Sequence, residues 1–151
     1  MELKELYQEI IIDHGTQPRN CCALKQASNT AEGFNPLCGD KVKIYLKIED
    51  NHVTQASFIG SGCAISTACA SLLTETLPGK HVDEAKSLSQ EFQKALKDTS
   101  GSANEKLGKL AALLGVKSFP ARVKCATLPC HTLEAALVNN DNTVSTEASD
   151  E

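Results

Sequence analysis

The order of apolar and polar residues predicts one helix, then a small sheet, then a run of helices. Near the N-terminus, five apolar residues recur at helical spacing within residues 2–14: Leu3, Leu6, Tyr7, Ile10 and Ile11. Over residues 42–48, apolar residues alternate with lysines and a tyrosine, which is typical of a strand with one buried face. After a turn at 49–52, residues 53–59 are predicted to return as its antiparallel partner, and residues 23–30 as a short edge strand.

The second half of the chain has helical character. After Gly60-Ser61-Gly62, the pattern predicts helices over 64–77, 83–96, 105–114 and 120–138, and Pro129 predicts a kink or a fresh start within the last of these. Strands followed by helices indicate an α+β fold, here a small antiparallel three-stranded sheet with helices packed on one face. We expect a single domain over residues 1–138 and a disordered acidic tail over 139–151.

Charge and composition exclude several classes of partner. The 151 residues carry 15 Lys and Arg against 19 Asp and Glu, and the tail holds four of these acids, so the rest of the chain is neutral. With six aromatic residues and no basic excess, a nucleic-acid partner is not expected. No apolar run approaches the roughly 18 residues of a membrane span and no signal peptide is visible, which predicts a cytoplasmic protein without membrane contact.

Cysteine is the most informative residue type in this sequence. Seven cysteines in a cytoplasmic chain favour metal binding or catalysis over disulfides. Three of them have unusual neighbours: Cys38 in NPLCGD, Cys63 in GSGCAIS and Cys125 in RVKCATL. Their spacing matches no C-x-x-C zinc signature, so the evidence for a site comes from the residues that neighbour each cysteine.

Each of these cysteines lies where a thiolate is favoured. Asp40 follows Cys38 by two residues, so the two side chains fall on the same side of an extended segment. Cys63 directly precedes a predicted helix, whose positive end stabilises a thiolate, and Cys125 is flanked by Arg122 and Lys124. Any one of the three cysteines is more simply explained as a small buried hydrophobe, but the three together favour a functional site.

The other four cysteines lack such neighbours. Cys69 and Cys130 fall on other helix faces than Cys63 and Cys125, so we expect them in the core. Cys21 and Cys22 are adjacent loop thiols to which the sequence assigns no role.

Together, Cys38, Asp40, Cys63 and Cys125 form a tetrahedral donor set that suits Zn²⁺. Three thiolates and a carboxylate leave such a site with a net negative charge after zinc binds. Arg122 and Lys124 are then the natural compensating cations.

Four motifs, in order, carry a resemblance to a known family: YQEIIIDHGTQPRN, NPLCGD, GSGCAIS and FPARVKCATL. They resemble the U-type iron-sulfur cluster assembly proteins, and the resemblance covers roughly residues 2–138. Two features favour the SufU branch over the IscU branch. Lys124 stands where IscU-like scaffolds have histidine, and residues 107–119 resemble an additional segment of SufU proteins.

The resemblance implies a zinc-dependent sulfurtransferase that accepts persulfide sulfur from a pyridoxal-phosphate (PLP) cysteine desulfurase, stimulates that enzyme, and passes the sulfur to a downstream Suf scaffold. It implies that Cys38, Asp40, Cys63 and Cys125 bind zinc, and that Cys38 is the sulfur acceptor. We expect Arg122 to hold the charge of the freed sulfur. Two alternatives remain: a scaffold on which a two-iron two-sulfur cluster is assembled, and a non-catalytic module with a structural zinc.

Overall fold

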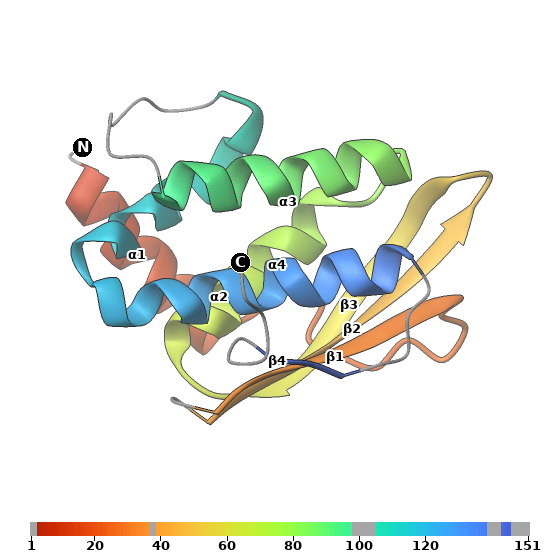
Figure 1. The fold of residues 1–151 in the computed structure, drawn as a ribbon, viewed down its shortest axis with the longest axis horizontal. Helices are drawn as coiled ribbons and strands as arrows, with labels where there is room; N and C mark the ends of the chain where they lie inside the picture. Colours follow the sequence, from red (N-terminus) through yellow and green to blue (C-terminus); the bar gives the residue numbers. More distant parts are fainter. Residues whose placement is uncertain (1–2, 37–38, 98–104, 139–142, 146–151) are drawn as a thin grey trace.

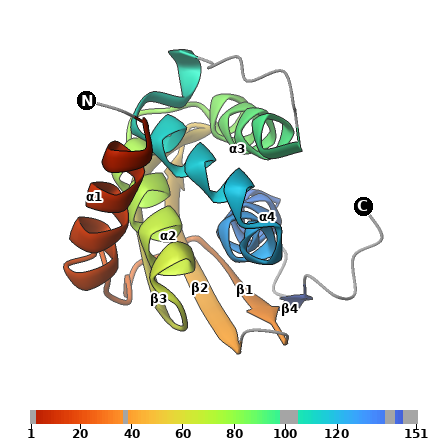
Figure 2. The same cartoon turned by 90° about the vertical axis from the view of Figure 1, so that its left-hand side faces the viewer.

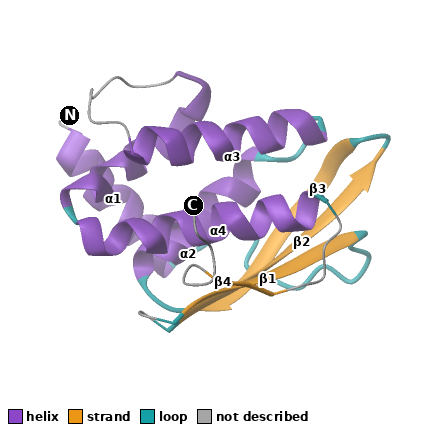
Figure 3. Ribbon diagram, viewed as in Figure 1, coloured by secondary structure: helices purple, strands orange, loops and turns teal. Residues whose placement is uncertain are grey.

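The structure is a computed structural model that describes residues 3–36, 39–97, 105–138 and 143–145. It has two layers, a twisted sheet and a layer of helices (Figures 1 and 3). The helices are α1 (Leu3–Thr16), α2 (Ala64–Thr76), α3 (Val82–Lys97), the 3-10 helices η1 (Glu105–Ser118) and η2 (Pro120–Arg122), and α4 (Val123–Leu137). The strands are β1 (Asn29–Asn35), β2 (Asp40–Glu49), β3 (His52–Ser61) and β4 (Thr143–Ser145).

The sheet has the strand order β3-β2-β1-β4. Strands β1, β2 and β3 are antiparallel neighbours, which confirms the predicted three-stranded sheet with helices on one face. The short strand β4 adds a fourth, parallel to β1. It falls within residues 139–151, where the sequence predicted disorder, so that prediction is wrong for residues 143–145. The remainder of this segment lies outside the described residues.

The edge strand predicted at 23–30 is misplaced, because β1 occupies Asn29–Asn35. Its buried positions are Ala31, Gly33 and Asn35, so this strand lacks the apolar alternation that identifies a half-buried strand. Gly33 is required by the close approach of α4, since a Cβ there would overlap the side-chain oxygen of Thr132. The need for glycine at this position therefore comes from a contact between distant parts of the chain.

The helices cover one face of the sheet, as the turned view in Figure 2 shows. Their aliphatic residues and the alternate residues of β2 form one core, whose largest fully buried members include Ile44, Leu46, Leu72, Phe92 and Leu128. α4 is a single helix that contains Pro129, so the predicted fresh start is wrong. In η1, Gly108 interrupts the helical turns at φ 55°, and the segment is 3-10 rather than one regular helix. Among the described residues, no helix is long and apolar enough to cross a membrane.

Candidate metal centre

Three side chains predicted as metal ligands converge at one end of the sheet. Ligand atoms of Asp40, Cys63 and Cys125 all lie within 4.8 Å of one another. They come from the start of β2, the residue before α2 and the first turn of α4. Asp40 and Cys125 are fully buried, and Cys63 is partly buried. The tertiary structure thus joins residues that lie 23 and 62 positions apart.

Asp40 is tied to the backbone of Cys63. Its Oδ1 atom accepts a hydrogen bond from the Cys63 N–H at 2.7 Å, and its Oδ2 atom lies 3.7 Å from the Cys63 sulfur. Gly62 permits this approach, because a Cβ at that position would overlap Oδ1 of Asp40. Gly62 therefore allows the Asp40 carboxylate to lie against the backbone of Cys63.

Cys63 is the N-cap of α2, as the sequence predicted. Its sulfur accepts a hydrogen bond from the N–H of Ser66 at 3.4 Å. The N–H groups of a first helical turn lack partners within the helix, and they favour a negative charge on the atom that caps them. The first turn of α2 thus supplies the Cys63 sulfur with a hydrogen-bond donor.

Asn35 is a site residue that the sequence analysis missed. It is fully buried at the end of β1, and its Nδ2 donates to the Cys125 sulfur at 3.9 Å. The backbone carbonyl of Asn35 accepts a hydrogen bond from the N–H of Gly39 at 2.8 Å. In the sequence, Asn35 is the first residue of the NPLCGD motif, of which only Cys38 and Asp40 were predicted to be site residues.

Tyr7 is a second residue near the site that the sequence analysis did not predict. There it was assigned only to the apolar face of the first helix. It is buried under Phe119, with ring centroids 6.4 Å apart and planes inclined by 20°. Burial raises the pKa of its phenol, and the charges of Cys63 and Cys125 raise it further, while Arg122 lowers it. Tyr7 therefore lies within electrostatic reach of two candidate ligands and of the arginine.

The remaining residues that the sequence analysis assigned to the site are Cys38, Arg122 and Lys124. Cys38 lies outside the described residues; the described chain resumes at Gly39, directly after it. Arg122 ends η2 and immediately precedes α4, and its side chain is exposed. Lys124 is also exposed, one residue before Cys125.

The prediction that Cys69 and Cys130 belong to the core is confirmed. Both are fully buried, and both sulfurs lie near the carbonyl oxygen of Ala126, at 3.0 Å and 3.9 Å. Burial raises the pKa of the Cys69 thiol well above its usual value, and a hydrogen bond with Cys130 adds to the effect. Cys21 and Cys22 are exposed.

His14, at the end of α1, is buried and joins two helices. Its Nδ1 lies 2.7 Å from the hydroxyl oxygen of Ser71 in α2, and the same oxygen accepts a hydrogen bond from the N–H of Arg19 at 2.8 Å. The Arg19 side chain pairs with Asp13 at 2.8 Å on the surface. This network fixes the loop after α1 against α2.

The donor set fits a zinc ion. Bond lengths of about 2.3 Å to sulfur and 2.0 Å to oxygen place a thiolate and a carboxylate about 3.5 Å apart in a tetrahedron. The separation between Asp40 Oδ2 and Cys63 Sγ is 3.7 Å. Two thiols and a carboxylate at this spacing, largely buried, are a suitable partial shell for a metal that accepts both donor types.

Comparison with known proteins decides the family. A family model described as the NifU-like N-terminal domain matches residues 6–126. The chain belongs to this family. The resemblance to U-type iron-sulfur assembly proteins, drawn from four motifs, is thereby confirmed.

Relatives within the NifU-like family bear two kinds of name. The chain is 37% identical to the zinc-dependent sulfurtransferase SufU of Bacillus subtilis, over 92% of this chain and 94% of that protein. It is 39% identical to the iron-sulfur cluster assembly scaffold protein IscU of Thermotoga maritima, over 91% of this chain and 96% of that protein. Identity alone therefore does not separate sulfur transfer from scaffolding.

A solved structure gives the same architecture. The crystal structure of FiSufU, a protein of the SUF system from Fervidobacterium islandicum, superposes with a TM-score of 0.81 at 32% identity. The match covers 88% of this chain and 97% of that one. The helix layer and sheet described above are thus the fold of this NifU-like family.

Proposed function

We propose that this chain is a zinc-dependent sulfur-transfer protein of iron-sulfur cluster assembly. It accepts persulfide sulfur from a PLP-dependent cysteine desulfurase on Cys38 and passes it to a downstream Suf scaffold, in the cytoplasm. The observation that carries the proposal is the convergence of Asp40, Cys63 and Cys125, whose ligand atoms lie within 4.8 Å of one another. Asp40 is the last residue of the NPLCGD motif and the first residue of β2. The 37% identity to the B. subtilis sulfurtransferase supports the same reading.

In this proposal Cys38, Asp40, Cys63 and Cys125 hold the zinc, which, when bound, keeps the thiols deprotonated and ready to react. The chemistry of transfer is thiol exchange. The Cys38 thiolate attacks the terminal sulfur of the desulfurase persulfide, a new sulfur-sulfur bond forms, and the desulfurase cysteine leaves as a thiolate. Cys38 then carries the persulfide, and no external oxidant or reductant is needed.

The protein's own residues prepare this exchange. Asp40 fixes the backbone of Cys63, Asn35 donates to the Cys125 sulfur, and the N-terminal turn of α2 supplies N–H groups to Cys63. The oxygen ligand favours zinc over a cluster, because iron-sulfur clusters are normally held by four cysteines. Lys124, in place of the histidine of IscU-like scaffolds, points the same way.

We assign Arg122 the role of holding negative charge on the sulfur in transfer. It immediately precedes α4, three residues before Cys125, and its charge acts on Tyr7 together with those of Cys63 and Cys125. Arg122→Gln should slow transfer about 100-fold, the scale of losing one charge-stabilising donor. Zinc content should stay unchanged, and Arg122→Lys should recover part of the rate. Full transfer by the glutamine variant would remove Arg122 from the mechanism.

The deciding experiment has two steps. Metal analysis of the purified protein should show one zinc per chain, and mass spectrometry after incubation with a cysteine desulfurase and cysteine should show an added sulfur on Cys38. Cys38→Ala should abolish both the persulfide and the stimulation of the desulfurase while the protein stays folded. The matched control is Cys22→Ala, which removes an exposed thiol and should leave both intact.

Other outcomes select the alternatives. Stimulation by Cys38→Ala equal to that of the unchanged protein would overturn the acceptor role. The structural-zinc alternative predicts a different result. The unchanged protein would bind zinc but transfer no sulfur, and Cys38→Ala would lower its stability. The scaffold alternative, favoured by the 39% identity to the T. maritima protein, requires visible charge-transfer absorption and iron that can be passed to an apo-acceptor.

A further inference from the structure

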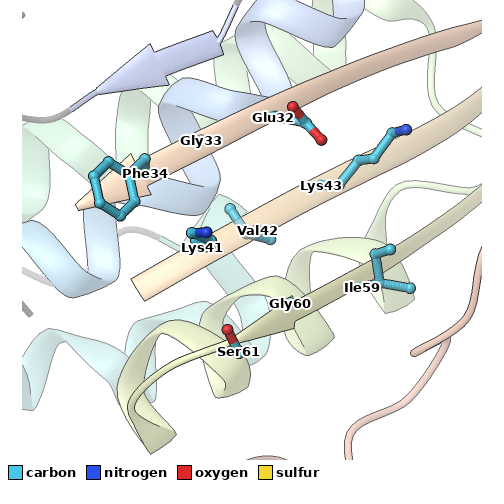
Figure 4. A pocket seen from close by; sticks show the side chains of 9 residues that line it. All are labelled: Glu32, Gly33, Phe34, Lys41, Val42, Lys43, Ile59, Gly60 and Ser61. Atoms are coloured by element: carbon cyan, nitrogen blue, oxygen red, sulfur yellow. The ribbon is translucent and has the colours of Figure 1, made fainter. Parts of the chain in front are cut away.

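An open groove lies on the sheet face opposite the helices, at the end nearest the metal centre (Figure 4). Its volume is about 690 Å³, and the side chains that point into it belong to alternate residues of three strands: Glu32, Phe34, Lys41, Lys43, Ile59 and Ser61. Farther along the same face, Tyr45 and Ser57 are buried. There the chain crosses from Cys21, beside β3, to the start of β1 on the other side of β2. The groove is the part of the face that this crossing leaves open.

The groove presents two lysines that have no carboxylate partner among the described residues. Lys41 lies over the Phe34 ring at 5.8 Å, and Lys43 over the Tyr45 ring at 5.1 Å, whereas Lys47 on the same strand pairs with Glu49. Glu32 is the one acid in the groove lining; it faces Lys43 in register but forms no ion pair with it. Two cations between the apolar Phe34 and Ile59 suit a short acidic segment.

Strand β4 ends beside β1, one of the strands that line the groove. α4 begins near the metal centre at Cys125 and ends at the start of β1, where the Asn29 amide donates to the Ala136 carbonyl at 2.8 Å. β4 then runs parallel to β1, back toward the metal centre, and its last residue, Ser145, is opposite Phe34. The sequence that follows is Thr-Glu-Ala-Ser-Asp-Glu, with three acids and no base.

The register places this acidic segment within reach. Ser145, Phe34 and Lys41 lie in one row across the sheet. Since neighbouring strands are about 4.8 Å apart, Lys41 is about 10 Å from Ser145 along that row. Six residues extend at most about 20 Å, so Glu147, Asp150 and Glu151 can reach both lysines. Residues 1–138 have no net charge, so the attraction comes from these local cations rather than from the whole molecule.

We propose that residues 146–151 of this chain dock in the groove beside the metal centre, with their carboxylates paired to Lys41 and Lys43. The docked segment neutralises the basic row formed by Lys41 and Lys43. The proposal does not depend on sulfur transfer, and it assigns the acidic C-terminus a binding partner within the same molecule.

Zero-length carbodiimide cross-linking of the full chain tests the docking, because it joins only carboxylates and amines in contact. Mass spectrometry should find the acids of residues 146–151 linked to Lys41 or Lys43 more often than to Lys124, because docking raises their local concentration at the two groove lysines above that given by tethering alone. Lys124 is the matched control, since it is exposed next to Cys125, at the same end of the molecule, but outside the groove. The preference should vanish when NaCl is raised from about 0.01 M to about 1 M, which shortens the Debye length from about 30 Å to about 3 Å.

An equimolar mixture of unlabelled and ¹⁵N-labelled chains identifies the occupant. Links within one chain support the proposal, and links between light and heavy chains would replace it with docking of a second copy. Cross-links from residues 146–151 to Lys41, Lys43 and Lys124 at equal frequency would overturn it. As a second measurement, Glu147→Gln/Asp150→Asn/Glu151→Gln, which alters only the tail, should shift the amide resonances of Lys43 and Ile59 but not that of Lys86. Unmoved resonances would also overturn the proposal.

Discussion

The backbone N–H of Cys63 donates to the buried carboxylate of Asp40 across 2.7 Å, so one candidate ligand positions another. Asp40 is therefore both a possible metal ligand and a structural acceptor at the junction of β3 and α2. These two roles predict different effects for different substitutions, which makes the site testable without relying on activity alone.

We expect Asp40→Asn and Asp40→Ala to differ. The asparagine keeps an oxygen that can accept from the Cys63 N–H, so it should fold normally yet bind zinc more weakly, by at least the roughly 10- to 100-fold that loss of an outer partner costs. The alanine also leaves a buried N–H without its partner and should lose about 1–3 kcal/mol of stability. Chelator competition and urea unfolding measure the two effects. Zinc affinity that is unchanged in Asp40→Asn would exclude Asp40 as a ligand.

Asn35 should act on the metal through Cys125. Asn35→Ala removes the amide that donates to the Cys125 sulfur, and zinc affinity should fall about 10- to 100-fold. Asn29→Ala is the control, because it removes an amide from the opposite end of the same strand, where the acceptor is the Ala136 carbonyl. That variant should lower stability while chelator competition stays as in the unchanged protein. Equal zinc affinities for both variants would contradict the assignment.

Gly62→Ala should disturb the site more than an alanine at another glycine with positive φ. Its Cβ would overlap Oδ1 of Asp40, so the carboxylate must move, at a cost of about 1–3 kcal/mol and with loss of zinc. Gly79 has φ +92° with nothing within 4 Å of the new Cβ, so Gly79→Ala tests backbone strain alone, about 1–2 kcal/mol. If zinc content were the same in both variants, the close approach at Gly62 would not matter for the metal.

Cys69 should make the fold less stable at alkaline pH. Its thiol has a raised pKa in the folded state, so the unfolded chain loses its proton first as the pH rises. The contribution is present below the usual cysteine pKa of about 8.5 and is lost above it, with a slope of at most about 1.4 kcal/mol per pH unit. Urea unfolding from pH 7 to pH 10 measures the slope, which should shrink in Cys69→Ala. Cys22→Ala, at an exposed thiol, is the control, and an identical slope in all three proteins would contradict the prediction.

The local pattern was sufficient where a segment carries its own signal. The alternation in β2 depends on side chains within one strand, and the Cys63 N-cap depends on the glycines before it and the helix after it, so both could be predicted. β1 could not, because its buried positions are Ala31, Gly33 and Asn35, which give no apolar alternation. β4 carried no apolar pattern, and its pairing with β1 depends on the chain turning back after α4.

The sequence by itself determined the fold class, the family motifs and the cysteines worth testing, since each of these is written in short stretches of residues. Only the tertiary structure decided that Asp40, Cys63 and Cys125 meet, that Asn35 donates to the Cys125 sulfur, and that β4 returns to the same end of the sheet. The physical reason is that these contacts join positions tens of residues apart. They form because the helices bury one face of the sheet, a property of the whole core rather than of any single segment.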